Sequence, residues 1–368
     1  MPKRRPAKKR SPAAAVLLAV LCLLLLAVSR YLDSRSEPAA SVSAPEAAQA
    51  DASGLEGHFL DIGQGDSALL FCGEETMLID GGKVKNNQKL IARLKELEVD
   101  HLDAVICSHP DEDHCGGLSA VLASTRTDAF YCSVDSWHTK VFSDVTKYVA
   151  EQGISVTIPQ AGDTFAFSDA SVEFLGPVVD YGDDPNEGSL VARVRYGETS
   201  FLFTGDMGFE AEDDMLAAGV DVSATVLKVA HHGSAGSSST EFLQAVHPQY
   251  AVISVGADND YGHPTEAALN RLSACGIPVY RTDLLGEIIA VSDGKTVTIT
   301  SASNEAPPAS DAASQTAGSY GYVGNSSSKV VHLASCGKLP GESNRVYFAS
   351  LDEALAAGYR KHANCLGN

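Results

Sequence analysis

A short segment of the chain concentrates side chains that can bind metal ions. Four such residues lie within six positions: His109, Asp111, Asp113 and His114. Divalent cations need several nitrogen or oxygen lone pairs at roughly 2–2.6 Å. The apolar run 104–107 directly before the segment indicates a buried strand, and a loop leaving a strand can direct several side chains to one place. The segment therefore predicts a metal centre on a strand-to-helix loop.

Later segments add further histidine and aspartate side chains. Asp206 follows an apolar run, and His263 precedes a proline. His231 and His232 follow another apolar run and are themselves followed by Gly-Ser. A single histidine there would be a capping or packing residue, but the pair predicts that one of the two acts as a metal ligand or proton donor. Which of the two has that role is open from the residues alone.

Polar residues also occur in the opening part of the same region. Asp61, Gln64 and Asp66 stand among glycines, and Asp80 precedes two glycines. Side chains of this kind stabilise turns through hydrogen bonds to the backbone. We therefore expect local turn roles for these four residues and no direct part in catalysis.

The order of these segments resembles the metallo-β-lactamase superfamily, whose signature is H-x-H-x-D-H. More narrowly it resembles the hydrolase domain of the ComEC/Rec2 competence proteins, which read H-x-D-x-D-H-x-G-G. Five further segments match that narrower pattern in the same order. They are residues 60–67, 78–82, 203–206, 227–234 and 261–264. The resemblance implies a hydrolase with an αββα sandwich fold.

The resemblance also implies how the residues share two divalent metal ions. The residues concerned are His109 and Asp111 for one ion, Asp113 and His114 for the other, and Asp206 as the bridge. His263 or His232 would complete the second site. Two ions roughly 3.5–4 Å apart can hold a hydroxide between them, which would be the nucleophile. Asp113, with His231 or His232, would act on the reaction itself.

The sequence departs from the wider superfamily at one expected ligand. A histidine is usual some way before the bridging aspartate, but this chain offers Asn186, Glu187 and Ser189 there, as the competence-type domains also do. His138 lies too early in the order to substitute, so we expect one ion to be bound more weakly or through water. Aspartate at position 111 makes the ligand set harder, which leaves zinc and manganese both open.

Hydrophobic patterning predicts the elements that position these residues. Predicted strands lie at 58–62, 67–71, 76–80, 104–107, 171–175, 190–195, 201–204, 225–230, 251–255 and 287–291. Predicted helices lie near 90–97, 139–151, 208–218, 239–246 and 265–274. Two mixed sheets packed face to face, with helices outside, would bury these runs. A three-layer α/β fold also fits the periodicity.

The N-terminal region indicates a membrane anchor. Residues 1–12 form a basic flank, and residues 13–32 form an apolar segment with no charge over 13–28. This arrangement is typical of a signal anchor or a cleaved secretory signal, with the flank in the cytoplasm and the remainder outside. No good cleavage site follows, so we expect an uncleaved anchor; cleavage would give a secreted protein. Residues 33–56, rich in Ala, Ser and Pro, predict a flexible spacer.

A second linker, 302–328, separates a main domain of 57–301 from a tail of 329–368. The tail contains four residues that can bind zinc: His332, Cys336, His362 and Cys365. It resembles the small Ada-type metal-binding fold, although Lys361 and His362 replace the Pro and Cys of the usual R-P-C-x-x-C ending. We expect one zinc ion to stabilise an α+β module too small to be stable by burial alone. A disulfide between the two cysteines is the alternative.

Charge limits the classes of substrate. Residues 1–35 hold eight of the 27 basic side chains and one of the 47 acidic ones, which leaves the remainder with a net charge of −27. This excess repels nucleic acid, because non-specific affinity for phosphate chains comes from Lys and Arg. Metal ions would therefore have to hold a polyanionic substrate. The motif set nevertheless favours a phosphodiesterase, with DNA outside the membrane as its substrate.

Two other functions stay open from the sequence. The same site could hydrolyse phosphocholine esters, cell-wall phosphodiesters or lactones. Alternatively, the metals could be structural in a non-catalytic surface-binding module. The sequence has one apolar segment of membrane-spanning type, so we expect no channel domain in this chain and no transport of DNA by this chain alone.

Overall fold

The computed structural model describes residues 54–257, 259–303, 322–333, 336, 338–341, 344–348 and 351–366. The expected anchor at 13–32 and most of the spacer and linker lie outside these ranges. Within the described ranges, no helix combines the length and the apolar character needed to cross a membrane. The first strand begins at Leu55, inside the segment expected as spacer.

Two β-sheets form the main domain. In spatial order the first contains β15 (Val297–Ser301), β14 (Ile288–Ser292), β1 (Leu55–Phe59), β2 (Ala68–Cys72), β3 (Glu75–Ile79), β4 (His101–Cys107), β5 (Arg126–Cys132) and β6 (Val156–Thr157). The second contains β13 (Val279–Arg281), β12 (Tyr250–Ile253), β11 (Val226–Lys228), β10 (Thr199–Phe203), β9 (Val191–Tyr196), β8 (Ala170–Gly176) and β7 (Thr164–Phe167). Both sheets mix parallel and antiparallel pairs.

Neighbouring residues of single strands face opposite sides of each sheet. Leu70 and Val226 belong to the core between the sheets. Leu69 and Leu227, one position away, pack against helices on the outer faces. Successive side chains of a strand alternate between faces, so both faces of both sheets are buried.

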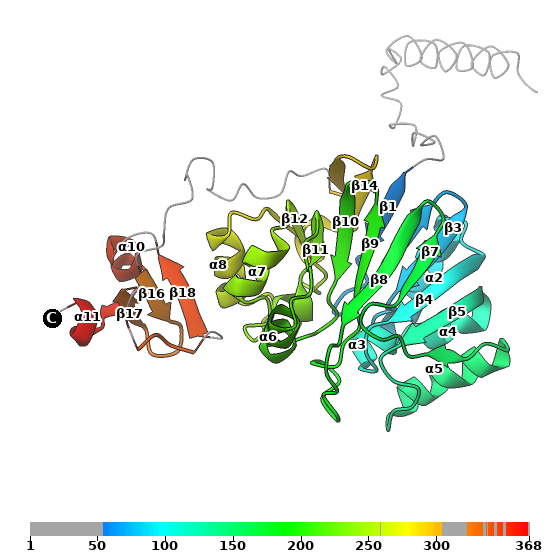
Figure 1. Cartoon of the computed structure of the whole chain (residues 1–368), viewed down its shortest axis with the longest axis horizontal. Coiled ribbons are helices and arrows are strands. Elements are labelled where there is room, and N and C mark those ends of the chain that lie inside the picture. The colour runs from blue at the N-terminus through cyan, green and yellow to red at the C-terminus, as the bar shows by residue number, and fades with distance from the viewer. Residues whose placement is uncertain are drawn as a thin grey trace, which may run out of the picture. The chain divides into compact units, whose positions relative to one another are not determined.

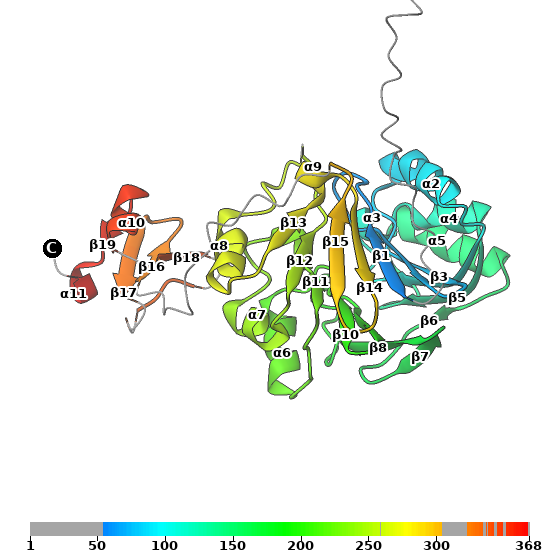
Figure 2. The same cartoon turned by 90° about the horizontal axis from the view of Figure 1, so that it is seen from above.

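Helices cover the two outer faces (Figures 1 and 2). The first sheet is covered by α2 (Asn87–Glu96), α4 (Leu118–Ser124) and α5 (Lys140–Glu151). The second is covered by α6 (Phe209–Ala217), α7 (Thr240–Val246) and α8 (Glu266–Ala274). The loops contain η1 (Val84–Asn86), α3 (Glu112–Cys115), η2 (Ala230–Gly233) and α9 (Thr282–Leu285). The expected αββα sandwich is confirmed, and the three-layer alternative is wrong because two sheets pack face to face.

The tail folds around a small sheet of its own. Its strands, in spatial order, are β18 (Arg345–Phe348), β16 (Tyr322–Asn325), β17 (Val330–Leu333) and β19 (Arg360–Lys361), with helices α10 (Leu351–Ala356) and α11 (Ala363–Leu366). Five buried side chains form its core: Val331, Val346, Phe348, Ala354 and Tyr359.

Parallel strands direct several loops of the sandwich to one edge. β3 runs parallel to β4 in the first sheet, and β10, β11 and β12 run parallel in the second. The carboxyl ends of parallel strands meet at the same edge of a sheet, where ligands commonly bind. The residues at or directly after these ends are Asp80, Ser108–His114, Asp206, Lys228–His232 and Ser254–His263.

Candidate metal centre

The carboxylate of Asp206 lies between histidines from two other loops. His114 Nε2 is 3.1 Å from Asp206 Oδ1, and His232 Nε2 is 3.5 Å from Asp206 Oδ2. His232 Nε2 is also 3.7 Å from Asp113 Oδ2, and the rings of His109 and His114 are 4.1 Å apart. Residues from the first sheet's loops thus face residues from the second sheet's loops.

Several buried atoms of this group make no hydrogen bond outside the group, and their nearest polar neighbours are one another. They are the Nε2 atoms of His109, His114 and His232, Oδ1 of Asp206 and Nδ1 of His263. Buried polar side-chain atoms in folded proteins are nearly always paired. Imidazole nitrogens and carboxylate oxygens that converge in this way are the ligands of divalent transition metals. The donor set therefore fits metal ions.

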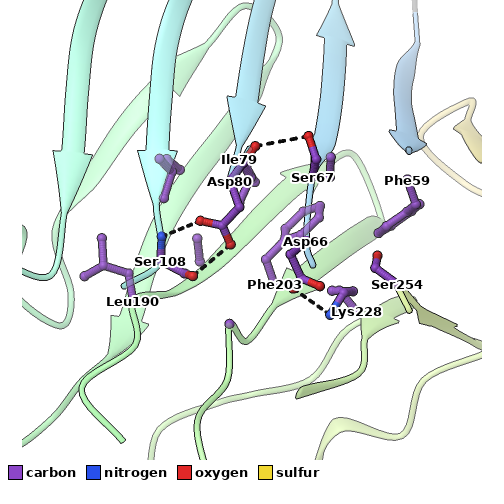
Figure 3. A pocket seen from close by; sticks show the side chains of 14 residues that line it. Phe59, Asp66, Ser67, Ile79, Asp80, Ser108, Leu190, Phe203, Lys228 and Ser254 are labelled. Atoms are coloured by element: carbon purple, nitrogen blue, oxygen red, sulfur yellow. Dashed lines mark hydrogen bonds and ion pairs between the residues drawn. The ribbon is translucent and has the colours of Figure 1, made fainter. Parts of the chain in front are cut away.

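Asp80 fixes the orientation of His114. Asp80 Oδ2 lies 2.9 Å from His114 Nδ1. The same carboxylate accepts hydrogen bonds from Ser108 N at 2.7 Å and Ser108 Oγ at 2.8 Å, as Figure 3 shows. A carboxylate on Nδ1 favours the proton on that nitrogen, so Nε2, which faces Asp206, is the atom that a metal ion would take. The turn role expected for Asp80 is therefore wrong, because its carboxylate is buried against a ligand from the next strand's loop.

Asp66 fixes His232 in the same manner. His232 Nδ1 donates to the carbonyl of Ser254 at 2.9 Å and lies 3.1 Å from Asp66 Oδ1. Lys228, which is 3% exposed, pairs with Asp66 at 2.7 Å and donates to the carbonyl of Val229 at 2.8 Å (Figure 3). A carbonyl oxygen only accepts, so Nδ1 of His232 carries a proton and Nε2 faces Asp206.

Asp66 was expected to stabilise a turn, and this expectation is also wrong. Its carboxylate, with donor atoms of His114, Asp206 and His232, forms a buried group whose atoms all lie within 4.8 Å of one another. The sequence did hold a signal, because Lys228 interrupts an apolar strand. A buried ammonium needs a buried carboxylate as its partner.

Burial and neighbouring charges set the protonation of these residues. Burial disfavours charged His114 and His232, but Asp206 and the other carboxylates outweigh it, raising the pKa of His114 well above its usual range and that of His232 to about 10. Burial also opposes ionisation of Asp206, but His114 and His232 hold its pKa well below the ordinary value. Burial and the adjacent His114 lower the pKa of His109 to about 3. A metal ion must displace the imidazole protons, so acid weakens its binding.

A family model for the metallo-β-lactamase superfamily matches residues 60–257. The chain belongs to the metallo-β-lactamase superfamily. Its matched region begins one residue after β1 and ends in the loop after β12, so it includes the Asp66, Asp80, Asp206 and His232 contacts just described.

Two relatives bear out the expected resemblance to competence proteins. Competence protein ComA of Neisseria gonorrhoeae is 33% identical over 285 residues, which are 76% of this chain and 38% of ComA. ComE operon protein 3 of Bacillus subtilis (strain 168) is 31% identical over 247 residues, 62% of this chain and 32% of the relative. The chain thus spans about a third of the length of these relatives. Among solved structures, the metallo-β-lactamase fold protein YhfI of Bacillus subtilis aligns at 13% identity and a TM-score of 0.46, over 65% of this chain and all of YhfI.

The remaining expected ligands of this superfamily member lie around the same group. Asp111 Oδ2 is 3.9 Å from His109 Nε2, and its side chain is 41% exposed. His231 Nε2 is 3.7 Å from Asp206 Oδ2, and the ring of His263 is 5.5 Å from that of His231. The structure therefore brings together every residue that the sequence predicted for the hydrolase site.

The two histidines of the His-His-Gly-Ser motif are presented by an unusual turn. His231 and His232 both have left-handed backbone conformations, with φ of 50° and 53°. Non-glycine residues seldom adopt this conformation, and functional sites are where it concentrates. Gly233 continues the turn at φ 81°, and a Cβ there would lie 2.6 Å from Pro264. Only glycine fits, because the loop bearing His263 packs directly against this turn.

Ser189 occupies the region where the wider superfamily has a histidine. Its Oγ lies 3.3 Å from His109 Nδ1 and accepts a hydrogen bond from the backbone N–H of Asp206 at 3.1 Å. Glu187 instead accepts from the N–H groups of Gly208 and Ala211 at the start of α6. Ser189 thus orients His109 and the loop of Asp206, while His138 packs against Trp137.

The tail brings its four expected ligands together. The donor atoms of His332, Cys336, His362 and Cys365 all lie within 4.8 Å of one another. His362 Nδ1 is 3.2 Å from Cys365 Sγ and 3.7 Å from Cys336 Sγ. Both cysteines are free thiols. Two sulfurs and two imidazoles at this spacing match the donor set of a tetrahedral zinc site.

Proposed function

We propose that the chain is a metal-dependent phosphodiesterase that cleaves DNA on the outer side of a membrane. The observation that carries this proposal is the group of buried nitrogen and carboxylate donors that meets at Asp206. Two adjacent divalent ions bound there would activate a water and stabilise charge on a phosphoryl oxygen. The similarity to two competence proteins supports DNA as the substrate class.

The resemblance to the competence-type domains divides the proposed ligands between two ions. His109 and Asp111, 3.9 Å apart, would hold one ion, and Asp113 and His114 the other, with Asp206 between them. His232 would complete the second set, because its Nε2 faces both Asp113 and Asp206. Both zinc and manganese suit this mixture of imidazole and carboxylate.

His231 would serve as the proton donor to the leaving oxygen. It lies 3.7 Å from Asp206 Oδ2, and 30% of its side chain is exposed, whereas His232 is buried. A general acid must reach both solvent and the leaving group of the substrate. His263 lies beside it and would complete this side of the site.

The N-terminal segment would determine where the enzyme is located, and the tail would form a separate metal-binding module. Residues 13–32 would anchor the chain in a membrane, with the domain on the outer side. The tail would bind one zinc ion through its two cysteines and two histidines, as an Ada-like module does. These assignments rest on the apolar segment of the sequence and on the convergence of the four tail residues.

The full chain, reconstituted with Mn²⁺ or Zn²⁺, tests the proposal on labelled single- and double-stranded DNA and on bis-p-nitrophenyl phosphate. Asp113→Ala removes a ligand and is expected to reduce cleavage by roughly 100-fold or more. The matched control is Asp144→Ala on α5, whose carboxylate pairs with Lys140 at the surface.

Each outcome leads to a different conclusion. Cleavage of the small ester without DNA cleavage would replace DNA with small phosphodiesters or cell-wall esters as substrates. Unchanged activities in Asp113→Ala would mean that hydrolysis comes from a contaminant. An inactive wild type with tightly bound metal would favour the surface-binding module.

A further inference from the structure

An exposed aromatic ring stands at the rim of the metal centre. Tyr261 is 59% exposed, the largest fraction among the exposed large apolar side chains of the described residues. Its ring stacks on the imidazole of His263 at a centroid distance of 5.7 Å and an interplanar angle of 23°. His263 in turn lies 6.3 Å from His232, so the tyrosine extends the line of rings outward from the site.

The loop that carries Tyr261 is held by one side chain. Asn259 Nδ2 donates to the carbonyls of Gly256 and His263, at 2.8 and 2.7 Å. Asn259 Oδ1 accepts from the N–H groups of Tyr261 and His263, at 3.2 and 3.0 Å. These four bonds fix the backbone on both sides of the ring. Exposure of the tyrosine is therefore imposed by its loop, at the cost of leaving an apolar surface in water.

A lysine lies between the ring and the metal ligands. Lys83 Nζ is 3.9 Å from Asp113 Oδ2, 3.3 Å from the hydroxyl of Tyr261 and 5.0 Å from the centre of its ring. Its side chain is 18% exposed. In a domain with a large acidic excess, this lysine places a positive charge where a substrate phosphate would approach the ions.

We propose that Tyr261 and Lys83 form a nucleotide-binding rim, in which the ring stacks on an unpaired base and the ammonium contacts the neighbouring phosphate. This inference rests on the proposed phosphodiesterase function and deepens it. Aromatic faces combined with cations are how proteins bind single strands without sequence preference. Paired bases already stack on their neighbours within a duplex. The rim therefore favours single-stranded DNA or frayed ends.

Substrates with and without bases test the role of the ring. The full chain, loaded with Mn²⁺, is compared on an oligothymidylate, on an abasic oligomer of equal length and on a duplex, with kcat/KM measured for each. The wild type is expected to prefer the oligothymidylate over the abasic oligomer by roughly tenfold or more. Tyr261→Ala is expected to lose that preference while cleaving the abasic oligomer as the wild type does. Tyr261→Phe keeps the ring and is expected to keep the preference.

Salt dependence tests the lysine. Lys83→Ala is expected to reduce the slope of log KM against log salt concentration by about 0.7, the contribution of one contact to a single-strand phosphate. Lys147→Ala is the matched control, because Lys147 on α5 lies over the ring of Tyr148 at 4.7 Å and is 58% exposed. Its slope is expected to equal that of the wild type.

The results separate this inference from the function on which it rests. Equal cleavage of the base-bearing and abasic oligomers by the wild type would contradict the nucleotide-binding rim, but it would be consistent with the proposed phosphodiesterase function. An equal loss on both oligomers in Tyr261→Ala also overturns it, since the ring would then act by packing on His263. A wild type that cleaves no phosphodiester removes the proposed function, and the rim with it.

Discussion

The two groups of candidate metal ligands in this chain differ in how they are supported. In the sandwich, His114 and Asp206 come from different sheets, and both are almost completely buried above large apolar cores. In the tail, all four residues lie between His332 and Cys365, beside a core of five side chains. The sandwich holds its ligands in place by packing, whereas the tail has little packing with which to do so.

This difference predicts opposite relations between metal and fold. A preformed set of ligands should bind and release ions without unfolding, as enzyme sites do. A module of about forty residues buries too little apolar surface for stability, so the binding energy of its ion would become folding energy.

Removal of metal is expected to have the largest effect, and only on the tail. Binding of a structural zinc ion is worth on the order of 10 kcal/mol. A chelator should therefore abolish amide exchange protection in β17, which contains His332, while β10 of the sandwich stays protected. Hydrogen–deuterium exchange with mass spectrometry measures both strands in one sample. Equal protection of β17 before and after chelation would show that the tail is stable without an ion.

Lys228→Met tests how much the buried ion pair between Lys228 and Asp66 stabilises the sandwich. The change leaves the carboxylate of Asp66 buried without its cation, so we expect a loss of about 3–5 kcal/mol in the free energy of unfolding. Denaturant titration measures this loss. In the double variant Asp66→Asn with Lys228→Met neither residue of the pair carries a charge, and most of the stability should return.

Metal affinity of the double variant should remain roughly 10- to 100-fold below that of the wild type, because His232 has lost its orienting carboxylate. Competition with a chromogenic chelator measures it. Restored affinity together with restored stability would mean that Asp66 serves the fold alone.

Ser189→Ala should have a smaller effect on the sandwich. Its Oγ contacts His109 and the N–H of Asp206, and loss of such an orienting contact costs roughly tenfold in metal affinity. Isothermal titration with Zn²⁺ measures the change. Ser124→Ala removes an equivalent hydroxyl from the surface of α4 and should leave the affinity unchanged. If both variants bind like the wild type, the serine does not position His109.

The smallest effect concerns pH and is independent of metal. Buried His58 lies 2.6 Å from Glu287 and 2.8 Å from Glu56. Burial disfavours its charged form, but these carboxylates outweigh burial and raise its pKa above the ordinary value. The imidazolium thus stabilises the fold fully below about pH 6.5, and the stabilisation is lost as pH rises through the raised pKa.

His58→Gln should remove this part of the pH dependence. The Tm of the wild type is expected to fall by roughly 2–4 °C more than that of the variant between neutral and alkaline pH. Differential scanning calorimetry provides the comparison. His101→Gln, at a partly exposed pair with Asp128, serves as control. Parallel pH profiles in wild type and His58→Gln would contradict the assignment.

The sequence predicted most of the sandwich because many of its strands are short continuous apolar runs, as expected for strands buried on both faces. It placed the first strand at 58–62, three residues late, since Leu60 and Ile62 remain buried after β1 has ended and so extend the apolar pattern into a turn. The sequence did not predict five strands of the sandwich: β5, β6, β7, β13 and β15. Three of them, β6, β7 and β13, have two to four residues, which carry too little periodicity.

The metal ligands were predictable because four of them share one loop. The roles of Asp66 and Asp80 were not, because both depend on contacts with residues 28 or more positions away. Their neighbours in sequence are glycines, which indicate a turn equally well. Only the contacts with distant residues show that these two aspartates orient histidines of the site and do not merely stabilise a turn.

The topology of the first sheet has a consequence for when the enzyme becomes active. β1 pairs with β2 on one side and with β14 on the other. The pairing of β1 is therefore complete only after β14, more than 200 residues later, has been synthesised. His114 and Asp206 face each other only once both sheets have docked. A nascent or partly unfolded chain therefore carries these residues without an assembled centre, and the proposed hydrolysis would begin only with the completed sandwich.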